Sequence, residues 1–308
     1  MNWEEADFIN PGGLPRHASR SSVMLRTSLA SASRRASNPA PPRDRCLSGT
    51  VTGERGASSD DGSDRMSSFI AVLRSVRVGM LLGRGLLTLS RLSATAPSAH
   101  REARIQQWAC AVLQALGIQV RLQGVIQPGQ LLVANHVSWL DVIVLHSLCP
   151  QARFVAKADV LRWPLIGRLA QGAGTLFVQR DRPRMAARIV SEVTAVLGSG
   201  GTVMVFPEGT TSDGVGVLPF RSSLLQAAFA GNGAAQPLAV RYSEGTQPIS
   251  PSVRYLGDDS LVQSIWWLCR ARGVVAKVTA LPLRAASSAD RKAFAAELRA
   301  DIEQALTQ

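Results

Sequence analysis

The spacing of hydrophobic and polar residues changes twice along the chain. Residues 1–65 show no sustained apolar period, whereas residues 66–92 are mostly apolar and their only charged residues are four arginines. From residue 118 onward, short apolar runs typical of strands alternate with amphipathic stretches typical of helices. Because strands and helices alternate in this way, the pattern predicts an α/β fold in which helices flank a central mixed sheet.

The chain therefore divides into an N-terminal extension (1–65), a basic, apolar helical region (66–117) and an α/β domain (118–308). Strands are expected at 118–122, 130–134, 154–156, 175–178, 203–206, 238–242 and 274–280. Helices are expected at 99–116, 141–148, 184–197 and 288–306.

The extension is rich in Ser, Arg, Pro, Ala and Gly, and its nine Arg nearly balance its eight Asp or Glu. Such a composition buries too little apolar surface to fold, so we interpret residues 1–65 as disordered. The acidic residues do not suit a transit peptide, and no signal-peptide core is evident. A mis-assigned start is the simplest explanation. Met66 would then be the first residue, and a native protein whose intact mass begins at Met1 would refute this.

The segment 66–92 predicts a helix that carries a basic stripe, because Arg74, Arg77, Arg84 and Arg91 interrupt its apolar residues. No uninterrupted apolar run reaches the roughly 18 to 20 residues that a simple bilayer span requires. A helix that lies in the membrane interface, with its arginines at the headgroups, fits better. A single transmembrane span remains the alternative. We expect the α/β domain to be preceded by membrane-interacting helices.

Positive charge is concentrated in the same part of the chain. Residues 66–130 hold seven Arg and one Glu, so their net charge of 7 − 1 = +6 is half of the chain's net charge of +12. This predicts contact with anionic membrane lipid, as a peripheral or monotopic protein at the cytoplasmic face of the inner membrane. Only 5% of the residues are aromatic, which argues against nucleic acid as a partner. The four cysteines form no CxxC pair or Cys/His cluster, so neither a metal site nor a disulfide framework is expected.

The most informative stretch is LLVANHVSWLD (131–141), in which a buried strand leads to Asn135 and His136. Ser138 is placed to cap a helix whose first turn holds Asp141. The carboxylate would fold back onto one imidazole nitrogen and leave the other facing a cleft. A hydroxyl is a poor nucleophile near neutral pH, so its attack on an acyl carbonyl needs such a positioned base. Taken alone, a His and an Asp at this spacing more often belong to a structural histidine.

Three further motifs follow in order, namely KADVLRWPLIG (157–167), GTLFVQR (174–180) and FPEGTTS (206–212). The ordered set of four resembles the glycerophospholipid acyltransferase family, typified by the lysophosphatidic acid acyltransferases, over roughly residues 130–245. The resemblance implies an enzyme that moves a fatty acyl group from a thioester of acyl carrier protein or coenzyme A onto the hydroxyl of a lysophospholipid acceptor. It implies no cofactor and no metal.

The resemblance also implies roles for individual residues. His136 would be the general base and Asp141 the carboxylate that orients it. The implied acceptor-binding residues are Gly174, Phe177, Arg180, Glu208, Gly209 and Thr210. Arg180 would contact the acceptor's phosphate, because a guanidinium offers it a forked pair of donors. Lys157 is a candidate for a second phosphate contact, with a solvated surface lysine as the alternative.

One position departs from the family pattern. Many members carry a basic residue directly after FPEGT, where this chain has Thr211, followed by Ser212 and Asp213. We therefore keep two acceptors open. The leading hypothesis is 1-acyl-sn-glycerol 3-phosphate, which would give phosphatidic acid in phospholipid biosynthesis, and the alternative is a lyso-ornithine lipid.

Two other classes of function are weighed against acyl transfer. A non-catalytic peripheral membrane-binding protein would act through the helix at 66–92 and would not need four ordered motifs. A His136→Ala variant that kept all activity would favour it. A hydrolase would use water in place of the acceptor hydroxyl, but no Gly-x-Ser-x-Gly nucleophile elbow is present in the sequence.

Overall fold

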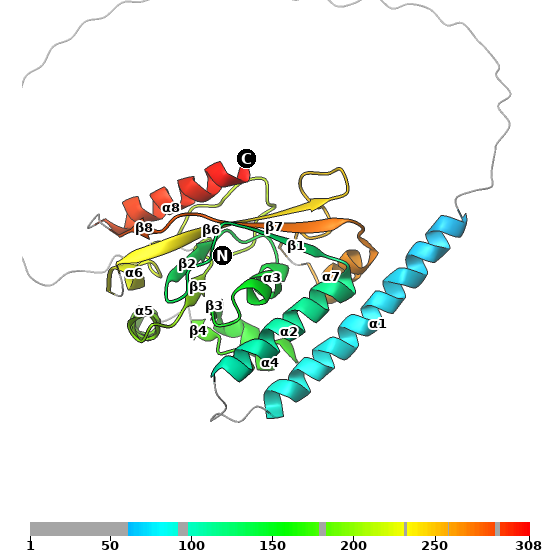
Figure 1. Cartoon of the computed structure of the whole chain (residues 1–308). Coiled ribbons are helices and arrows are strands. Elements are labelled where there is room, and N and C mark those ends of the chain that lie inside the picture. The colour runs from blue at the N-terminus through cyan, green and yellow to red at the C-terminus, as the bar shows by residue number, and fades with distance from the viewer. Residues whose placement is uncertain (1–60, 92–97, 179–182, 231–232, 258, 287–289) are drawn as a thin grey trace, which may run out of the picture. The chain divides into compact units, whose positions relative to one another are not determined.

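A mixed sheet forms the centre of the α/β domain, with helices on both of its faces (Figure 1). The computed structural model describes residues 61–91, 98–178, 183–230, 233–257, 259–286 and 290–308. Within them the strands are β1 (Gln119–Gln123), β2 (Leu131–Ala134), β3 (Arg153–Lys157), β4 (Leu176–Val178), β5 (Val203–Val205), β6 (Ala234–Glu244), β7 (Val274–Ala280) and β8 (Arg284–Ala285). The prediction of an α/β fold with a central mixed sheet is confirmed.

The strand order places β2 in the middle of the sheet. The order is β1-β7-β6-β2-β5-β3-β4, and β8 pairs with β6. Neighbouring strands are parallel, except that β7 and β8 run antiparallel to β6. Because β2 and β5 are parallel neighbours, their carboxyl ends meet at one edge of the sheet. The residues that follow these two strands are therefore brought together there.

The helices among the described residues are α1 (Asp61–Arg91), α2 (Ser98–Leu116), α3 (Leu140–Leu148), α4 (Ile166–Gly172), α5 (Pro183–Gly198), α6 (Gln226–Ala230), α7 (Leu261–Arg270) and α8 (Arg291–Leu306), with a 3-10 turn η1 (Ala158–Arg162). The hydrophobic pattern predicts α2, α3, α5 and α8 to within three residues at each end, and it does not predict η1, α4, α6 or α7. Helix α1 begins at Asp61, inside the stretch interpreted as disordered. Residues 1–60 lie outside the described residues.

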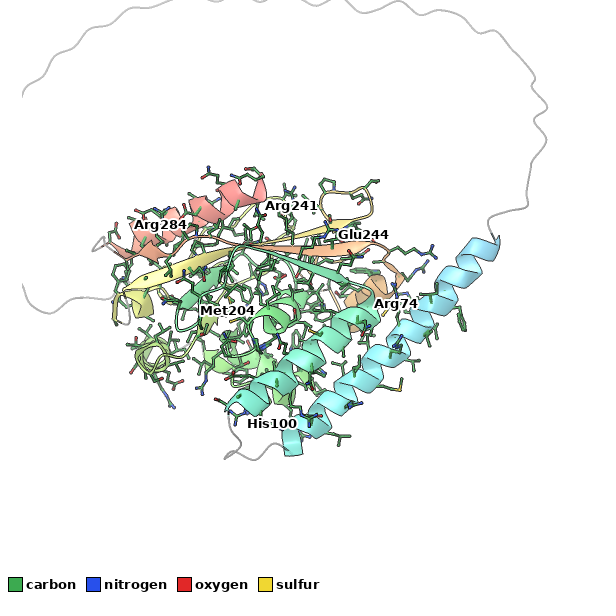
Figure 2. The ribbon with its side chains drawn as sticks, in the orientation of Figure 1. Arg74, His100, Met204, Arg241, Glu244 and Arg284 are labelled. Carbon is green, nitrogen blue, oxygen red and sulfur yellow. The ribbon has the colours of Figure 1, made fainter. Side chains whose placement is uncertain are left out.

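The side chains of β2 alternate between two cores. Leu132 and Ala134 pack with residues of α1, α2, α3 and α7, whereas Leu131 and Val133 pack with residues of α5, α6 and α8. All four are fully buried, which explains why this strand has the continuous apolar sequence LLVA. Met204, in the middle of β5, lies inside the same layered interior (Figure 2).

Helix α1 packs against the domain along one narrow stripe. Its buried residues Ala71, Val78 and Gly85 recur every seven positions and so lie on one side of the helix. Arg74 donates from a guanidinium nitrogen to the carbonyl oxygen of Ala271 at 2.7 Å, at the C-terminal end of α7 (Figure 2). A cation in this position complements the partial negative charge of a helix C-terminus, so Arg74 joins α1 to α7.

The opposite side of α1 is exposed and apolar. Its large exposed hydrophobic residues are Phe69, Val72, Leu73, Val76, Met80 and Leu87. Arg77 and Arg84 are exposed beside them. None of the helices in the described part of the chain is both long enough and apolar enough to cross a membrane.

Candidate active site

His136 and Asp141 lie in contact at the carboxyl end of β2. The chain leaves β2 at Ala134, and Asp141 is the second residue of α3. The Oδ2 atom of Asp141 lies 2.8 Å from Nδ1 of His136. A carboxylate only accepts, so we assign the ring hydrogen to Nδ1, which leaves the lone pair on Nε2. The contact that the spacing predicts is therefore present in the structure.

The imidazole of His136 is accessible, although its partner is not. The His136 side chain is 19% exposed and the Asp141 side chain 0%. The imidazole stacks on the ring of Phe206, with centroids 4.1 Å apart and 14° between the planes. Phe206 directly follows β5, so the end of a second strand supports the ring. Because Nδ1 faces the carboxylate, Nε2 lies on the far side of the ring, where a substrate hydroxyl could bond to it.

Four donors hold the buried carboxylate of Asp141. Besides the His136 ring, Oδ2 accepts the main-chain N–H groups of Val137 at 2.7 Å and of Ser138 at 3.0 Å. Oδ1 accepts the hydroxyl of Tyr242 at 2.6 Å. Burial of a carboxylate without such partners would be strongly unfavourable. These bonds fix the position of the carboxylate and, through it, the orientation of the His136 ring.

The prediction that Ser138 caps α3 is wrong. The N-cap of this helix is Trp139, one residue later, and it makes no side-chain cap bond. The Oγ atom of Ser138 is buried and has no hydrogen-bond partner among the described residues. The N–H of Ser138 instead donates to Asp141. The carboxylate in the first helical turn reaches back to the segment before the helix and takes over the task of fixing it.

Glu208 ties the FPEGT turn to the main chain of His136. Its Oε1 accepts the N–H of His136 at 2.6 Å, and its Oε2 accepts the N–H of Leu218 at 2.9 Å. Burial raises the pKa of Glu208 to about 7, while the two N–H donors favour its ionised form. Ser212 adds a second tie, because its N–H and its hydroxyl both donate to the carbonyl oxygen of His136. Glu208 thus organises the site, and its predicted contact with the acceptor stays a prediction.

Gly209 and Thr210 form the tip of the same turn. Gly209 has a φ of +70°, which larger residues rarely adopt. A Cβ atom at Gly209 would lie 3.1 Å from Nε of Arg221, so the turn and that side chain are in close contact. Thr210 is exposed beside it. The hydroxyl of Thr211 donates to the carbonyl oxygen of Tyr255, in the loop between β6 and α7.

The remaining predicted acceptor residues come from β3, β4 and the turn before β4. Lys157 is the last residue of β3, Phe177 lies in β4, and Gly174 precedes β4 with a φ of +80°. Because β3 and β4 are parallel to β5, their carboxyl ends point toward the edge of the sheet that holds His136. Arg180, the predicted phosphate ligand, lies outside the described residues. The roles of these residues remain predictions.

Two residues to which the sequence motifs assign no role join β6 to the site. The side-chain amide of Asn135 donates to the carbonyl oxygen of Val240 at 2.9 Å and accepts its N–H at 2.7 Å. Tyr242, two residues further along β6, holds Asp141. The available signal was the strand expected at 238–242, which contains both Val240 and Tyr242, because a strand beside β2 would bring a polar group of that strand close to Asp141.

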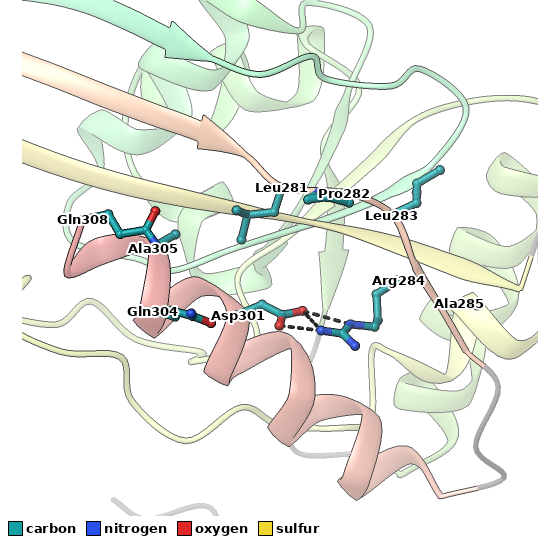
Figure 3. Close-up of a pocket in the computed structure, with 9 residues that line it drawn as sticks. All are labelled: Leu281, Pro282, Leu283, Arg284, Ala285, Asp301, Gln304, Ala305 and Gln308. Atoms are coloured by element: carbon teal, nitrogen blue, oxygen red, sulfur yellow. Dashed lines mark hydrogen bonds and ion pairs between the residues drawn. The ribbon is translucent and has the colours of Figure 1, made fainter.

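Two surface cavities lie apart from this site. One of about 450 Å³ is lined by residues 281–285 and the end of α8, where Arg284 forms an ion pair with Asp301 (Figure 3). The other, of about 610 Å³, is lined by residues of α7 and of the loop before it. Neither is lined by His136 or Asp141. In the described residues, no group of three or more His, Cys, Asp or Glu side chains is arranged to hold a metal ion.

Known proteins resemble this chain in sequence and in fold. A family model described as Acyltransferase matches residues 117–241. The chain is 36% identical to a lyso-ornithine lipid O-acyltransferase from Pseudomonas aeruginosa, over 68% of this chain and 83% of that protein. It is 31% identical to a 1-acyl-sn-glycerol-3-phosphate acyltransferase from Neisseria gonorrhoeae, over 78% of this chain and 94% of that protein.

The fold is similar to the crystal structure of the 1-acyl-sn-glycerophosphate acyltransferase PlsC from Thermotoga maritima. The TM-score is 0.58, over 79% of this chain and 96% of that one. The sequences are 16% identical, so this likeness concerns the fold.

Proposed function

The chain belongs to the acyltransferase family and is an enzyme of the glycerophospholipid acyltransferase type, and from that premise we propose that it acylates the free hydroxyl of 1-acyl-sn-glycerol 3-phosphate. The acyl donor would be a thioester of acyl carrier protein or coenzyme A, and the product phosphatidic acid. The observation that carries this proposal is the pair of His136 and Asp141, 2.8 Å apart, with the acid buried and the base accessible.

The proposed reaction is a direct transfer with His136 as base. Nε2 of His136 accepts the proton of the acceptor hydroxyl while the hydroxyl oxygen attacks the thioester carbonyl carbon. The carboxylate of Asp141 stabilises the imidazolium that forms. When the tetrahedral intermediate collapses, the carbon–sulfur bond breaks and the imidazolium returns the proton to the departing thiolate. The products are an ester and a free thiol, and the histidine is neutral again.

A lyso-ornithine lipid is the second candidate acceptor. The position after FPEGT carries no cation in this chain, and the hydroxyl of Thr211 is directed to the main chain at Tyr255. The relative from Pseudomonas aeruginosa, which is named for this acceptor, is also the more similar of the two proteins compared above. Both acceptors present a hydroxyl to the same base, so the mechanism is common to them.

An acyl-transfer assay with separate acceptors tests this proposal. Purified protein in detergent receives a radiolabelled acyl thioester with lysophosphatidic acid, with lyso-ornithine lipid, or with no acceptor. We expect label in phosphatidic acid and its loss in a His136→Ala variant, but not in a His100→Ala control on the exposed side of α2. Label only in the ornithine lipid would select the second acceptor. Release of labelled fatty acid without acceptor would identify a hydrolase instead.

We further propose that α1 binds the surface of an anionic membrane, at the cytoplasmic face of the inner membrane. Its exposed side combines large apolar residues with Arg77 and Arg84. Apolar side chains that insert below the headgroups, with arginines at the level of the lipid phosphates, are the features of an interfacial helix. The acceptor is a lipid, so this position would deliver it to the site.

Cosedimentation with lipid vesicles tests the role of α1. We expect the protein to bind vesicles that contain anionic phospholipid more tightly than neutral ones. A double substitution of Phe69→Ser and Met80→Ser should weaken this binding, whereas Val125→Ser, which changes an exposed residue between β1 and β2, should not. Equal binding of the Phe69/Met80 variant and the parent would contradict the proposal. Full cellular activity of the His136→Ala variant would favour a non-catalytic membrane-binding protein.

A further inference from the structure

The segment from Phe206 to Arg221 loops back onto its own beginning. One oxygen of Glu208 holds the N–H of Leu218 at 2.9 Å, and the N–H of Arg221 donates to the carbonyl oxygen of Pro207 at 2.9 Å. These two bonds close the loop, so that its last residue lies beside the FPEGT turn.

The side chain of Arg221 lies against this turn. A Cβ atom at Gly209 would be 3.1 Å from its Nε and 3.7 Å from its Cζ. The guanidinium therefore approaches the turn at a residue that has no side chain to keep it away. Gly209 follows Glu208, whose other oxygen bonds to the N–H of His136 at 2.6 Å. Glu208 thus ties the turn that Arg221 contacts to the main chain of His136.

Arg221 is the single basic residue of the sequence between 206 and 221. Several other polar side chains of this segment fix its fold through bonds to the main chain. Both oxygens of Glu208 accept main-chain N–H groups, and the hydroxyl of Thr211 donates to the carbonyl oxygen of Tyr255. Asp213 accepts the N–H of Val215. Partial burial lowers the pKa of Arg221. A guanidinium is a cation throughout the neutral range, and the lower local dielectric around a partly buried one strengthens its attraction to an anion.

We infer that Arg221 binds the anionic group of the lipid acceptor and so supplies the positive charge that the residue after FPEGT does not provide in this chain. This inference rests on the proposed acyl transfer. The anionic group is the phosphate of 1-acyl-sn-glycerol 3-phosphate or the carboxylate of a lyso-ornithine lipid. A guanidinium can donate two hydrogen bonds to either. In both lipids the anionic group lies only a few bonds from the hydroxyl that reacts, which suits a cation held at the turn that Glu208 ties to His136.

Acceptor kinetics of three variants at this position test the inference. Arg221→Met keeps an unbranched stem that packs beside Gly209 and removes the charge, whereas Arg221→Lys keeps a charge without the fork. Arg188→Gln on α5, where an exposed arginine pairs with Glu192, is the matched control for charge removal. Each variant is assayed with lysophosphatidic acid, with lyso-ornithine lipid and with monoacylglycerol, a neutral acceptor that offers the same kind of hydroxyl.

For Arg221→Met, KM for the anionic acceptor should rise by about 10- to 100-fold, the effect of losing one charge-assisted hydrogen bond. The KM for the thioester and the rate with monoacylglycerol should stay within about twofold. Arg221→Lys should show a smaller rise, and Arg188→Gln none. The anionic acceptor whose KM rises identifies the group that is bound.

Two results would overturn the inference. One is an unchanged KM for every acceptor in Arg221→Met. The other is an equal loss of rate with neutral and anionic acceptors, together with a lower melting temperature, which would assign Arg221 a purely structural role in the turn. Failure of the parent protein to acylate any acceptor would contradict the proposed function itself and is seen before any variant is compared.

Discussion

Tyr242→Phe is the substitution whose effect follows most directly from the geometry. Its hydroxyl donates to Oδ1 of Asp141 at 2.6 Å, and both side chains are buried. In the described residues, the other donors to this carboxylate all bond to Oδ2. Burial raises the pKa of Tyr242 well above 10, so the hydroxyl keeps its hydrogen. The variant therefore leaves Oδ1 buried without the donor that it has in the parent protein.

The expected loss of stability is about 1–3 kcal/mol, the penalty for a buried polar atom that loses its partner. For a domain of this size, each 1 kcal/mol lowers the melting temperature by roughly 2–4 °C. Turnover should also fall, because the carboxylate that orients His136 loses one of its four donors, while KM for the acceptor should change little.

Urea denaturation and acyl-transfer kinetics measure both effects. Tyr255→Phe is the matched control, since Tyr255 is the other tyrosine of the chain and accepts a hydrogen bond from Thr211 through its main-chain oxygen. A Tyr242→Phe variant with the stability and kcat of the parent would refute the reasoning. So would an equal loss in Tyr255→Phe.

Three further changes have defined outcomes. In Glu208→Gln the side-chain NH2 group must face one of the two main-chain N–H donors that the carboxylate accepts in the parent. Urea denaturation should therefore show a free energy of unfolding lower by about 1–3 kcal/mol, and kcat should fall. A variant with the stability and kcat of the parent would show that the two bonds are unimportant. Burial lowers the pKa of His146 from 6.5 to about 4, so the unfolded chain takes up the proton at a higher pH than the folded protein does. As the pH falls from 6.5 to 4, the free energy of unfolding of the parent should therefore drop by roughly 3 kcal/mol relative to that of His146→Leu. Stability profiles of the two proteins that stay parallel over this range would contradict the prediction. Gly209→Ala should lower the free energy of unfolding by about 1–2 kcal/mol and reduce activity, because residue 209 has a φ of +70°. Gly216→Ala, at a position with open space around it, should change neither stability nor activity.

The sequence predicts best what depends on neighbours in the chain. The run LLVA predicts a strand buried on both faces, and β2 has that position. His136 and Asp141 are five residues apart, so a strand end followed by a helix is enough to bring them together. Helices α2, α5 and α8 are long and have a regular apolar period, which makes them recognisable without any knowledge of the fold.

Contacts between distant parts of the chain could not be predicted in the same way. Tyr242 reaches Asp141 across 101 residues, because β6 lies beside β2 in the sheet. Arg221 lies at Gly209 because two bonds, one to Glu208 and one to the carbonyl oxygen of Pro207, close the intervening loop. Neither the order of strands in the sheet nor the closure of a loop can be predicted from local periodicity.

The prediction for Ser138 fails for a related reason. A serine before an apolar run is a good capping residue in isolation. Here the carboxylate of Asp141 bonds to the N–H groups of Val137 and Ser138, and the helix begins one residue later than this cap requires. A stronger acceptor nearby thus takes the place of the expected one, and the same carboxylate also bonds to the ring of His136.

The most direct test of acyl transfer by His136 is a single-turnover measurement with a radiolabelled acyl thioester and an excess of lysolipid. The parent protein should move label from the thioester into the ester lipid with no labelled protein at any time, and His136→Ala should move none while it still binds the acceptor. Label that passes through a covalently acylated protein, or a His136→Ala variant that transfers at the rate of the parent, would contradict direct transfer with this histidine as base.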